Sequence, residues 1–261
     1  MVAGNKSIDQ RTRVRNHMEL KDIEPLRRVG LLAAVDDAQL ERLGRGAYLQ
    51  RFPKGTALVE AGDQADFLHV LLEGAVELVG RAAGRETIVD ILWPVDCFAP
   101  AAALTGDRYL MGARTLLPSR ILLLEAANLR RCVAEDPTLA GTMIGLMAGQ
   151  HRRMVRQVMD LKLRTATQRL GCFLLRLIDA TGNGPAASLP FAKATLASRL
   201  GMTPENLSRA FRALEPAGID VEGSRVVVRD RARVEELCRP DALIDGVEAG
   251  SVPGNGLGEG P

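Results

Sequence analysis

Residues 193–214 carry the pattern that most restricts how this chain can fold. Apolar side chains first recur on one face of a short helix, at Leu196, Ala197 and Leu200. Gly201 then follows, a residue that commonly ends helices because it adopts positive φ at little cost. Thr203 and Pro204 suit the cap and the first turn of a second helix. That helix has apolar residues at spacings of four and three, at Leu207, Phe211 and Leu214. The segment therefore predicts two short helices around a tight turn.

The other face of the second helix is polar. It carries Glu205, Ser208, Arg209 and Arg212. Donors and acceptors at these spacings suit the base edges and phosphates of a DNA major groove, and Thr203 stands beside them. We interpret the segment as a helix-turn-helix that reads DNA. The alternative is an amphipathic helical hairpin in a larger core, with its charged face in solvent.

The flanking segments are typical of short strands. Leu189–Phe191 is expected to form a strand before the two helices, and residues 218–228 a hairpin that turns at Gly223–Ser224. Arg225 stands beside that turn, where a guanidinium reaches a phosphate. Strand, helix-turn-helix and hairpin together predict a winged helix.

Length and composition bound the class of protein. A chain of 261 residues with 46% apolar residues is long enough for two domains and a connector. No apolar run reaches membrane-spanning length and the N-terminus lacks a secretory pattern, so we expect a cytoplasmic protein with no membrane partner. The cysteines are too scattered for a zinc, disulfide or iron–sulfur framework: Cys97, Cys132, Cys172 and Cys238. The sequence shows no common catalytic motif in the right context, so we expect no enzyme.

The region before the two helices is predicted to be mostly β-structure. Short apolar segments alternate there with Gly, Pro and Asp: 57–59, 67–72, 75–79, 86–92, 109–115 and 120–124. Such spacing indicates a small antiparallel roll, with a helix expected over residues 22–43.

A long helix without internal proline is predicted from Pro137 to Lys162. Its residues at spacings of 3 and 4 form a heptad-like seam: Ile144, Met147, His151, Met154, Val158 and Leu161. A symmetric DNA reader needs a dimer interface, and this seam is the candidate. The alternative is a helix that packs on its own β-domain.

The fold class we expect is α+β: an antiparallel β-roll, a long dimerisation helix and a winged helix-turn-helix. The basic residues between Arg152 and Arg169 lie near the predicted DNA-binding helices, as expected of nucleic-acid binding, and the alternative is a basic helix that is simply solvated. The last residues are acidic and glycine-rich. The expected layout is a flexible arm (1–20), a sensor domain (21–134), the dimerisation helix (135–163), the DNA-binding domain (164–239) and a disordered tail (240–261).

This order of elements resembles the Crp/Fnr family of bacterial transcription regulators. In the roll, Lys54-Gly55, Gly62-Asp63 and Glu73-Gly74 are similar to the family's cyclic-nucleotide-binding-type domain, and Glu205-x-x-Ser208-Arg209 is similar to its recognition-helix signature. The segments 95–99 and 161–169 resemble those of the nitric-oxide-responsive denitrification (Dnr-type) regulators. The resemblance implies a homodimer, double-stranded DNA with a TTGAT-N4-ATCAA palindrome, and RNA polymerase as a partner.

Two departures from the family bear on the effector. Cyclic-AMP-binding members carry a Gly-Glu pair and, further on, an Arg-Ser pair; this chain has Ala99-Pro100 and Leu110-Met111 at those places. Without a cation, holding a cyclic phosphate in an apolar pocket costs several kcal/mol, so we reject cyclic AMP. No cysteine precedes Cys97, which argues against an oxygen-sensing cluster.

The resemblance implies haem b and nitric oxide as one effector system. The candidate iron ligands are His17, His69, Cys97, Met111 and His151. Each has an ordinary structural explanation as well, such as a buried strand residue for His69 or a small apolar residue for Cys97. A different small effector, constitutive DNA binding, and a ligand-sensing module with another output stay as alternatives.

Overall fold

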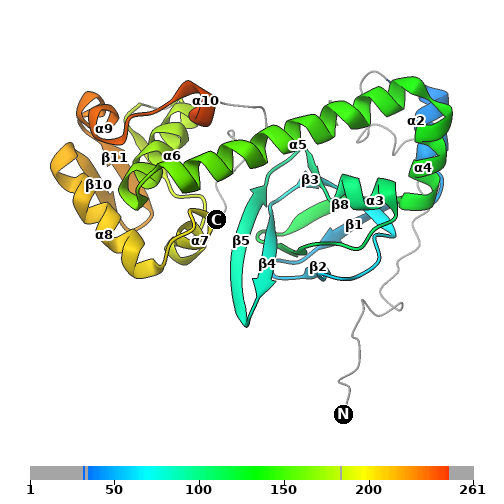
Figure 1. Ribbon diagram of the computed structural model, residues 1–261, viewed down its shortest axis with the longest axis horizontal. Coiled ribbons are helices and arrows are strands. Elements are labelled where there is room, and N and C mark those ends of the chain that lie inside the picture. The colour runs from blue at the N-terminus through cyan, green and yellow to red at the C-terminus, as the bar shows by residue number, and fades with distance from the viewer. Residues whose placement is uncertain (1–31, 33–34, 183, 247–261) are drawn as a thin grey trace, which may run out of the picture. The chain divides into compact units, whose positions relative to one another are not determined.

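The computed structural model of the protein describes residues 32, 35–182 and 184–246 (Figure 1). These residues divide into two compact units, one formed by residues 35–78 with 94–145 and the other by residues 79–93 with 146–246. The expected α+β class, with a β-rich part, long helices and a C-terminal helix-turn-helix, is confirmed.

The strands of the roll form two four-stranded sheets that contain antiparallel pairs. The strands are β1 (Tyr48–Phe52), β2 (Ala57–Val59), β3 (Phe67–Glu73), β4 (Val76–Ala82), β5 (Arg85–Leu92), β6 (Asp96–Phe98), β7 (Gly112–Thr115) and β8 (Ser119–Glu125). One sheet has the order β1-β8-β3-β6 and the other β2-β7-β4-β5. In the first, Leu68 pairs with Leu124 and Val70 with Leu122, and all four side chains are buried. These apolar pairs hold the centre of the roll together.

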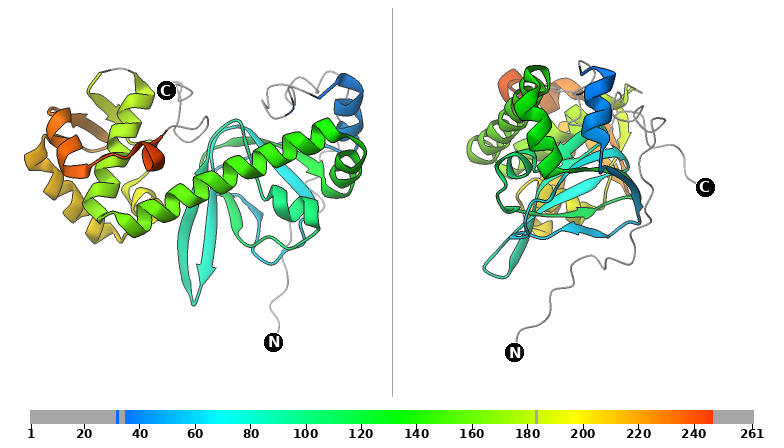
Figure 2. Two further views of the ribbon diagram at one scale, coloured as in Figure 1. Left: turned by 45° about the horizontal axis from the view of Figure 1, so that its top comes forward. Right: turned by 90° about the vertical axis from the view of Figure 1, so that its right-hand side faces the viewer.

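Three helices accompany the roll: α2 (Asp37–Gly44), α3 (Pro100–Thr105) and α4 (Ala126–Glu135). Helix α2 lies beside α4 (Figure 2). A helix was expected over residues 22–43, but in the described chain it begins only at Asp37. Asp36 has extended backbone angles and caps α2. Its Oδ1 accepts a hydrogen bond from the Gln39 amide at 2.8 Å. The earlier part of that expectation lies outside the described residues.

Helix α5 (Pro137–Leu163) is the long helix expected from the sequence. Its first two turns bury Leu139 and Met143, whereas later positions of the seam are exposed. The helix ends just before Thr165, which caps the next helix in a reciprocal pair with Gln168.

The second unit contains the winged helix. Its remaining elements are α6 (Ala166–Thr181), β9 (Ala186–Ser188), α7 (Lys193–Arg199), α8 (Pro204–Leu214), a 3-10 turn (Glu215–Ala217), β10 (Ile219–Glu222), β11 (Arg225–Val228), α9 (Arg231–Cys238) and α10 (Ala242–Asp245). The three strands form a sheet in the order β10-β11-β9. Their apolar side chains and those of the helices share one core, which includes Leu170, Leu196, Leu214, Val226 and Val234.

The chain after residue 240 differs from the disordered tail expected from its composition. Residues 242–245 form α10, and Asp241 caps it by accepting a hydrogen bond from the Leu243 amide at 2.7 Å. The acidic residue Asp245, which suggested a solvated tail, instead pairs with arginines. Residues 247–261 lie outside the described chain. Among the described helices, none combines the length and the apolar character that a membrane span needs.

Candidate nucleic-acid interface

The helix-turn-helix over residues 193–214 is confirmed in its bounds and in its turn. Gly201 adopts φ +62°, in the region that favours glycine, one residue beyond Leu200, the C-cap of α7. The Thr203 hydroxyl accepts a hydrogen bond from the Asn206 amide at 3.3 Å, and Pro204 occupies the first position of α8. These local signals fix the angle at which α8 leaves the turn.

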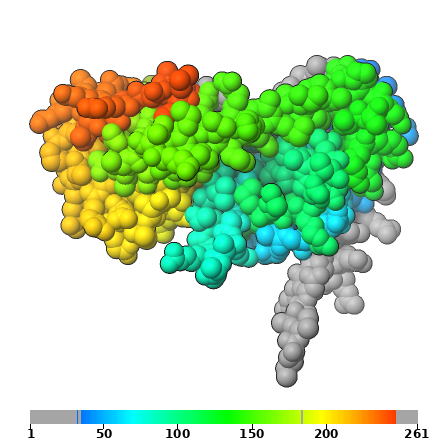
Figure 3. Space-filling view, in the orientation of Figure 1, coloured from blue at the N-terminus to red at the C-terminus, as the bar shows by residue number. Residues whose placement is uncertain are grey.

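Helix α8 separates its apolar and polar side chains sharply. The side chains facing the core are Leu207, Ala210, Phe211 and Leu214. Every residue predicted to contact DNA on this helix is exposed: Thr203, Glu205, Ser208, Arg209 and Arg212. Helix α8, yellow in Figure 3, lies at the surface. Its core face anchors the helix, which leaves a polar face of one Glu, one Ser and two Arg for an external ligand.

Polar contacts order two of these side chains. The Arg209 guanidinium donates to Asn206 Oδ1 at 2.7 Å. Hydrogen bonding to Thr203, and to its own backbone amide, holds the pKa of Glu205 below its usual range, so the carboxylate is charged. The sequence reasoning missed Asn206, although its spacing of three from Arg209 was the available signal. A neighbouring cation, Lys193, lies 5.5 Å above the Phe211 ring.

The hairpin after the helices turns at Gly223–Ser224, as expected, and Arg225 is exposed at the start of β11. The strand expected at Leu189–Phe191 is wrong in position, because β9 covers Ala186–Ser188 instead. Pro190 has no amide hydrogen and ends the pairing, after the Leu189 amide donates to the Ser224 carbonyl at 2.7 Å.

His69 is the most enclosed of the candidate effector ligands. It lies on β3 and is 3% exposed. Its ring stacks on Phe98, with centroids 4.5 Å apart, and meets Phe67 and Tyr109 edge-on. Burial lowers the pKa of His69 to about 3, so the imidazole is neutral, and its Nδ1 has no hydrogen-bond partner.

The other candidates do not gather around His69. Cys97 is buried on β6, where it pairs with Val70, so its side chain lies on the opposite face of the sheet from that of His69. Met111 is half-buried and His151 is exposed on α5, while His17 lies outside the described residues. Within the described ranges, no three His, Cys, Asp or Glu side chains form a metal site. The structure therefore does not bring two of these described residues together as a pair of axial haem ligands.

The predicted dimer seam is largely uncovered. Five of its six members are exposed and Met147 is half-buried. The apolar members include Ile144 at 64% exposure and Met154 at 59%. Large apolar side chains along one helix at this exposure are typical of a surface that another chain covers.

Two family models match the chain over the parts just described. Residues 49–136 match the cyclic nucleotide-binding domain, and residues 168–237 match the Crp-like helix-turn-helix domain. The chain belongs to the Crp/Fnr family. Crp/Fnr proteins of this kind are transcription regulators rather than enzymes, and the chain is a DNA-binding regulator with a cyclic-nucleotide-binding-type domain.

The chain is similar to regulators with different descriptions. The chain is 24% identical to the CRP-like cAMP-activated global transcriptional regulator of Mycobacterium tuberculosis, over 83% of this chain and 99% of that protein. It is 28% identical to the nitrogen fixation regulation protein FixK of Azorhizobium caulinodans, over 71% of this chain and 77% of FixK. The structure of FixK2 from Bradyrhizobium japonicum has the same fold, with a TM-score of 0.63 at 23% identity over 73% of this chain and 96% of FixK2.

Proposed function

We propose that the protein is a homodimeric transcription regulator that reads a TTGAT-N4-ATCAA palindrome and answers to an effector other than cyclic AMP. The observation that carries the proposal is the exposed polar face of α8, anchored by a fully apolar face beneath it. RNA polymerase is the partner through which such a regulator acts. The Dnr-type subclass belongs to this proposal as well.

The side chains of α8 match the proposed half-site chemically. Arg209 presents a fork of donors that suits guanine O6 and N7, and the charged Glu205 accepts from a cytosine amino group. Ser208 approaches a thymine, while Arg212 and Thr203 suit phosphates. Pro204 stands where cyclic-AMP receptors have a further base-reading arginine, so a TGTGA half-site lacks one of its contacts.

The effector part of the proposal rests on two places in the roll. Ala99, with φ 55°, and Pro100 begin α3, and neither offers a carboxylate for ribose hydroxyls. Leu110 is 91% exposed and, with Met111, offers no guanidinium for a phosphate. A regulator with this roll binds an effector that is less charged than cyclic AMP, such as nitric oxide through haem, or it binds no effector.

Competition binding tests the DNA part directly. At fixed salt, duplexes with TTGAT half-sites should compete more strongly than duplexes with TGTGA half-sites for the full-length protein. Arg209→Ala should cost about 1–3 kcal/mol per half-site and relax selection at the guanine. Arg225→Ala, the matched control on the wing, should weaken all duplexes about equally, since a phosphate contact carries no sequence information. Equal affinity of the wild type for both half-sites, or full selectivity after Arg209→Ala, would refute α8 as the reading helix.

A further inference from the structure

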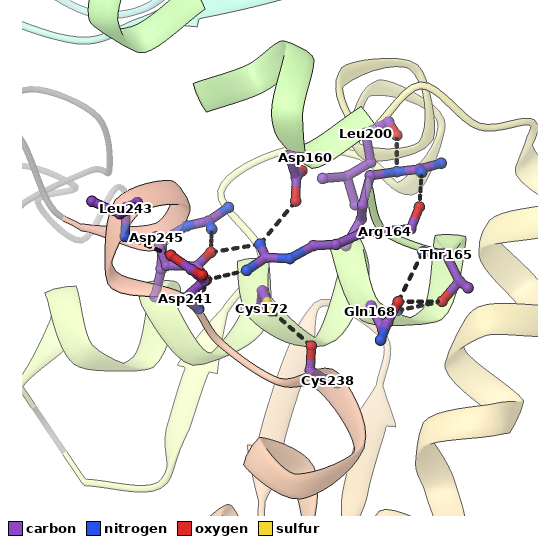
Figure 4. A network of polar contacts seen from close by, with 12 residues as sticks. Asp160, Arg164, Thr165, Gln168, Cys172, Leu200, Cys238, Asp241, Leu243 and Asp245 are labelled. Atoms are coloured by element: carbon purple, nitrogen blue, oxygen red, sulfur yellow. Dashed lines mark hydrogen bonds and ion pairs between the residues drawn. The ribbon is translucent and has the colours of Figure 1, made fainter. Parts of the chain in front are cut away.

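The short C-terminal segment Asp241–Gly246, which we call the clasp, binds the place where α5 and α6 meet (Figure 4). The carboxylate of Asp245 lies between two arginines. Arg164 donates to Asp245 Oδ1 at 2.9 Å and to Oδ2 through its other terminal nitrogen, in the forked geometry of a strong pair. Arg176, on α6, donates to the same Oδ1.

Arg164 occupies the junction itself. It follows Leu163, the last residue of α5, and precedes Thr165, the cap of α6. Its side chain is only 6% exposed and pairs with Asp160 at 2.9 Å as well as with Asp245. Burial acts to raise the pKa of Asp245, but hydrogen bonds from Arg164 and the Asp241 amide outweigh it, so the pKa lies below its usual range. Removing one carboxylate leaves a buried guanidinium short of a partner.

A second contact ties the clasp to α5 two turns earlier. The Arg156 guanidinium donates to the carbonyls of Leu243 and Gly246, each at 3.1 Å. These carbonyls lie within and directly after α10, where a cation is favourable. The clasp is therefore bound to α5 at Arg156 and to α6 at Arg176, with Arg164 between them.

The junction between α5 and α6 also contacts the helix-turn-helix, at the turn between α7 and α8. Buried Arg169, on α6, donates to the Arg164 carbonyl at 2.7 Å and to the Leu200 carbonyl, at the end of α7, at 3.0 Å. Gly201 follows, and a Cβ there would lie 2.6 Å from Leu161 Cδ2, so the end of α5 approaches the turn closely. A change of angle at the junction has to move the turn and α8 with it.

We propose that the clasp sets the angle between α5 and the winged helix, and that Asp245 is a positioning residue for DNA binding. In a two-fold dimer, this angle fixes the distance between the two recognition helices, and with it the half-site spacing. The clasp thereby selects the spacer length of the palindrome. This inference rests on the proposed function, since it presumes a dimer that reads two half-sites.

The test compares the full-length wild type with Asp245→Asn on TTGAT palindromes with spacers of about four and six base pairs, and on a single half-site. Loss of the clasp should reduce the preference for the four-base spacer by about tenfold, while single half-site affinity should stay within about twofold. Asp179→Asn is the matched control, because Asp179, on α6, also pairs with an arginine, Arg231 of α9, but this ion pair is exposed. It should keep the wild-type preference, and an unchanged spacer preference in Asp245→Asn would overturn the proposal.

Hydrogen exchange of residues 160–170 gives a second measurement that does not depend on DNA. Exchange should be faster in Asp245→Asn than in the wild type or Asp179→Asn, and unchanged exchange would also overturn the proposal. Should Asp245→Asn fail to fold, Arg156→Gln removes only the Leu243 and Gly246 contacts and should shift both measurements in the same direction. A wild type that shows no preference for TTGAT palindromes refutes the proposed function, while the exchange result still decides whether the clasp holds the junction.

Discussion

At the scale of single residues, the buried imidazole of His69 links stability to pH. Its pKa of about 3 lies below the ordinary value of 6.5, because burial disfavours the charged form. As pH falls below about 6.5, the unfolded chain takes up a proton at this position and the folded chain does not. The free energy of unfolding should therefore fall by about 2 kcal/mol between pH 6.5 and about pH 5 from His69 alone. His69→Phe, which keeps an aromatic ring beside Phe98, should remove this part of the loss.

Urea unfolding of the full-length protein at the two pH values, followed by circular dichroism, measures the difference. A loss in His69→Phe equal to that of the wild type would show that the His69 ring is protonated in the folded protein or is not enclosed as described.

At the scale of elements, patterns within about twenty residues were readable from the sequence, and pairings across the chain were not. The turn at Gly201 and the cap at Thr203 are local signals, and both helices of the motif lie where expected. Strands β1 and β6 were missed, since each is defined by a distant partner, β8 or β3. The clasp was missed for the same reason, because the acidic residue Asp245 reads as solvated until Arg164 and Arg176 are placed beside it.

Helix α5 is predicted to form the dimer interface through its exposed seam. Met154 and Val158 are 59% and 43% exposed on the seam, and in a dimer both would be covered by the second copy. Replacing both with Glu would place four like charges in that interface, which is strongly unfavourable without cationic partners. Sedimentation should then show a monomer where the wild type is a dimer. Arg152→Glu changes the charge of the exposed surface of α5 by the same two units outside the seam and should leave the dimer intact. A double variant that still sediments as a dimer would place the interface on another surface.

At the scale of the whole molecule, the effector that binds the roll decides how DNA binding by the winged helix is controlled. The M. tuberculosis relative is described as cAMP-activated, yet Leu110 and Met111 offer this chain no cation for a cyclic phosphate. Calorimetry with the full-length protein should detect no cyclic-AMP binding up to about millimolar concentration, because a buried phosphate without a charge partner is costly. A micromolar dissociation constant, or about −8 kcal/mol, would show that other residues hold the phosphate.

An optical spectrum, taken as isolated and after haem addition, separates the remaining effectors. Haem binding at His69 would need a rearrangement of the roll, since the ring is enclosed by Phe98 and Tyr109 and Cys97 lies on the other face of the sheet. If haem is the sensor, a Soret band should appear and shift with nitric oxide, and His69→Phe should abolish the band. DNA affinity must then differ between the haem-bound and nitric-oxide-bound forms, because an effector acts only through unequal affinity for two states of the protein. A protein that shows no Soret band and binds the TTGAT palindrome fully as isolated would instead be a constitutive reader, and its roll would serve to hold α5 rather than to sense haem.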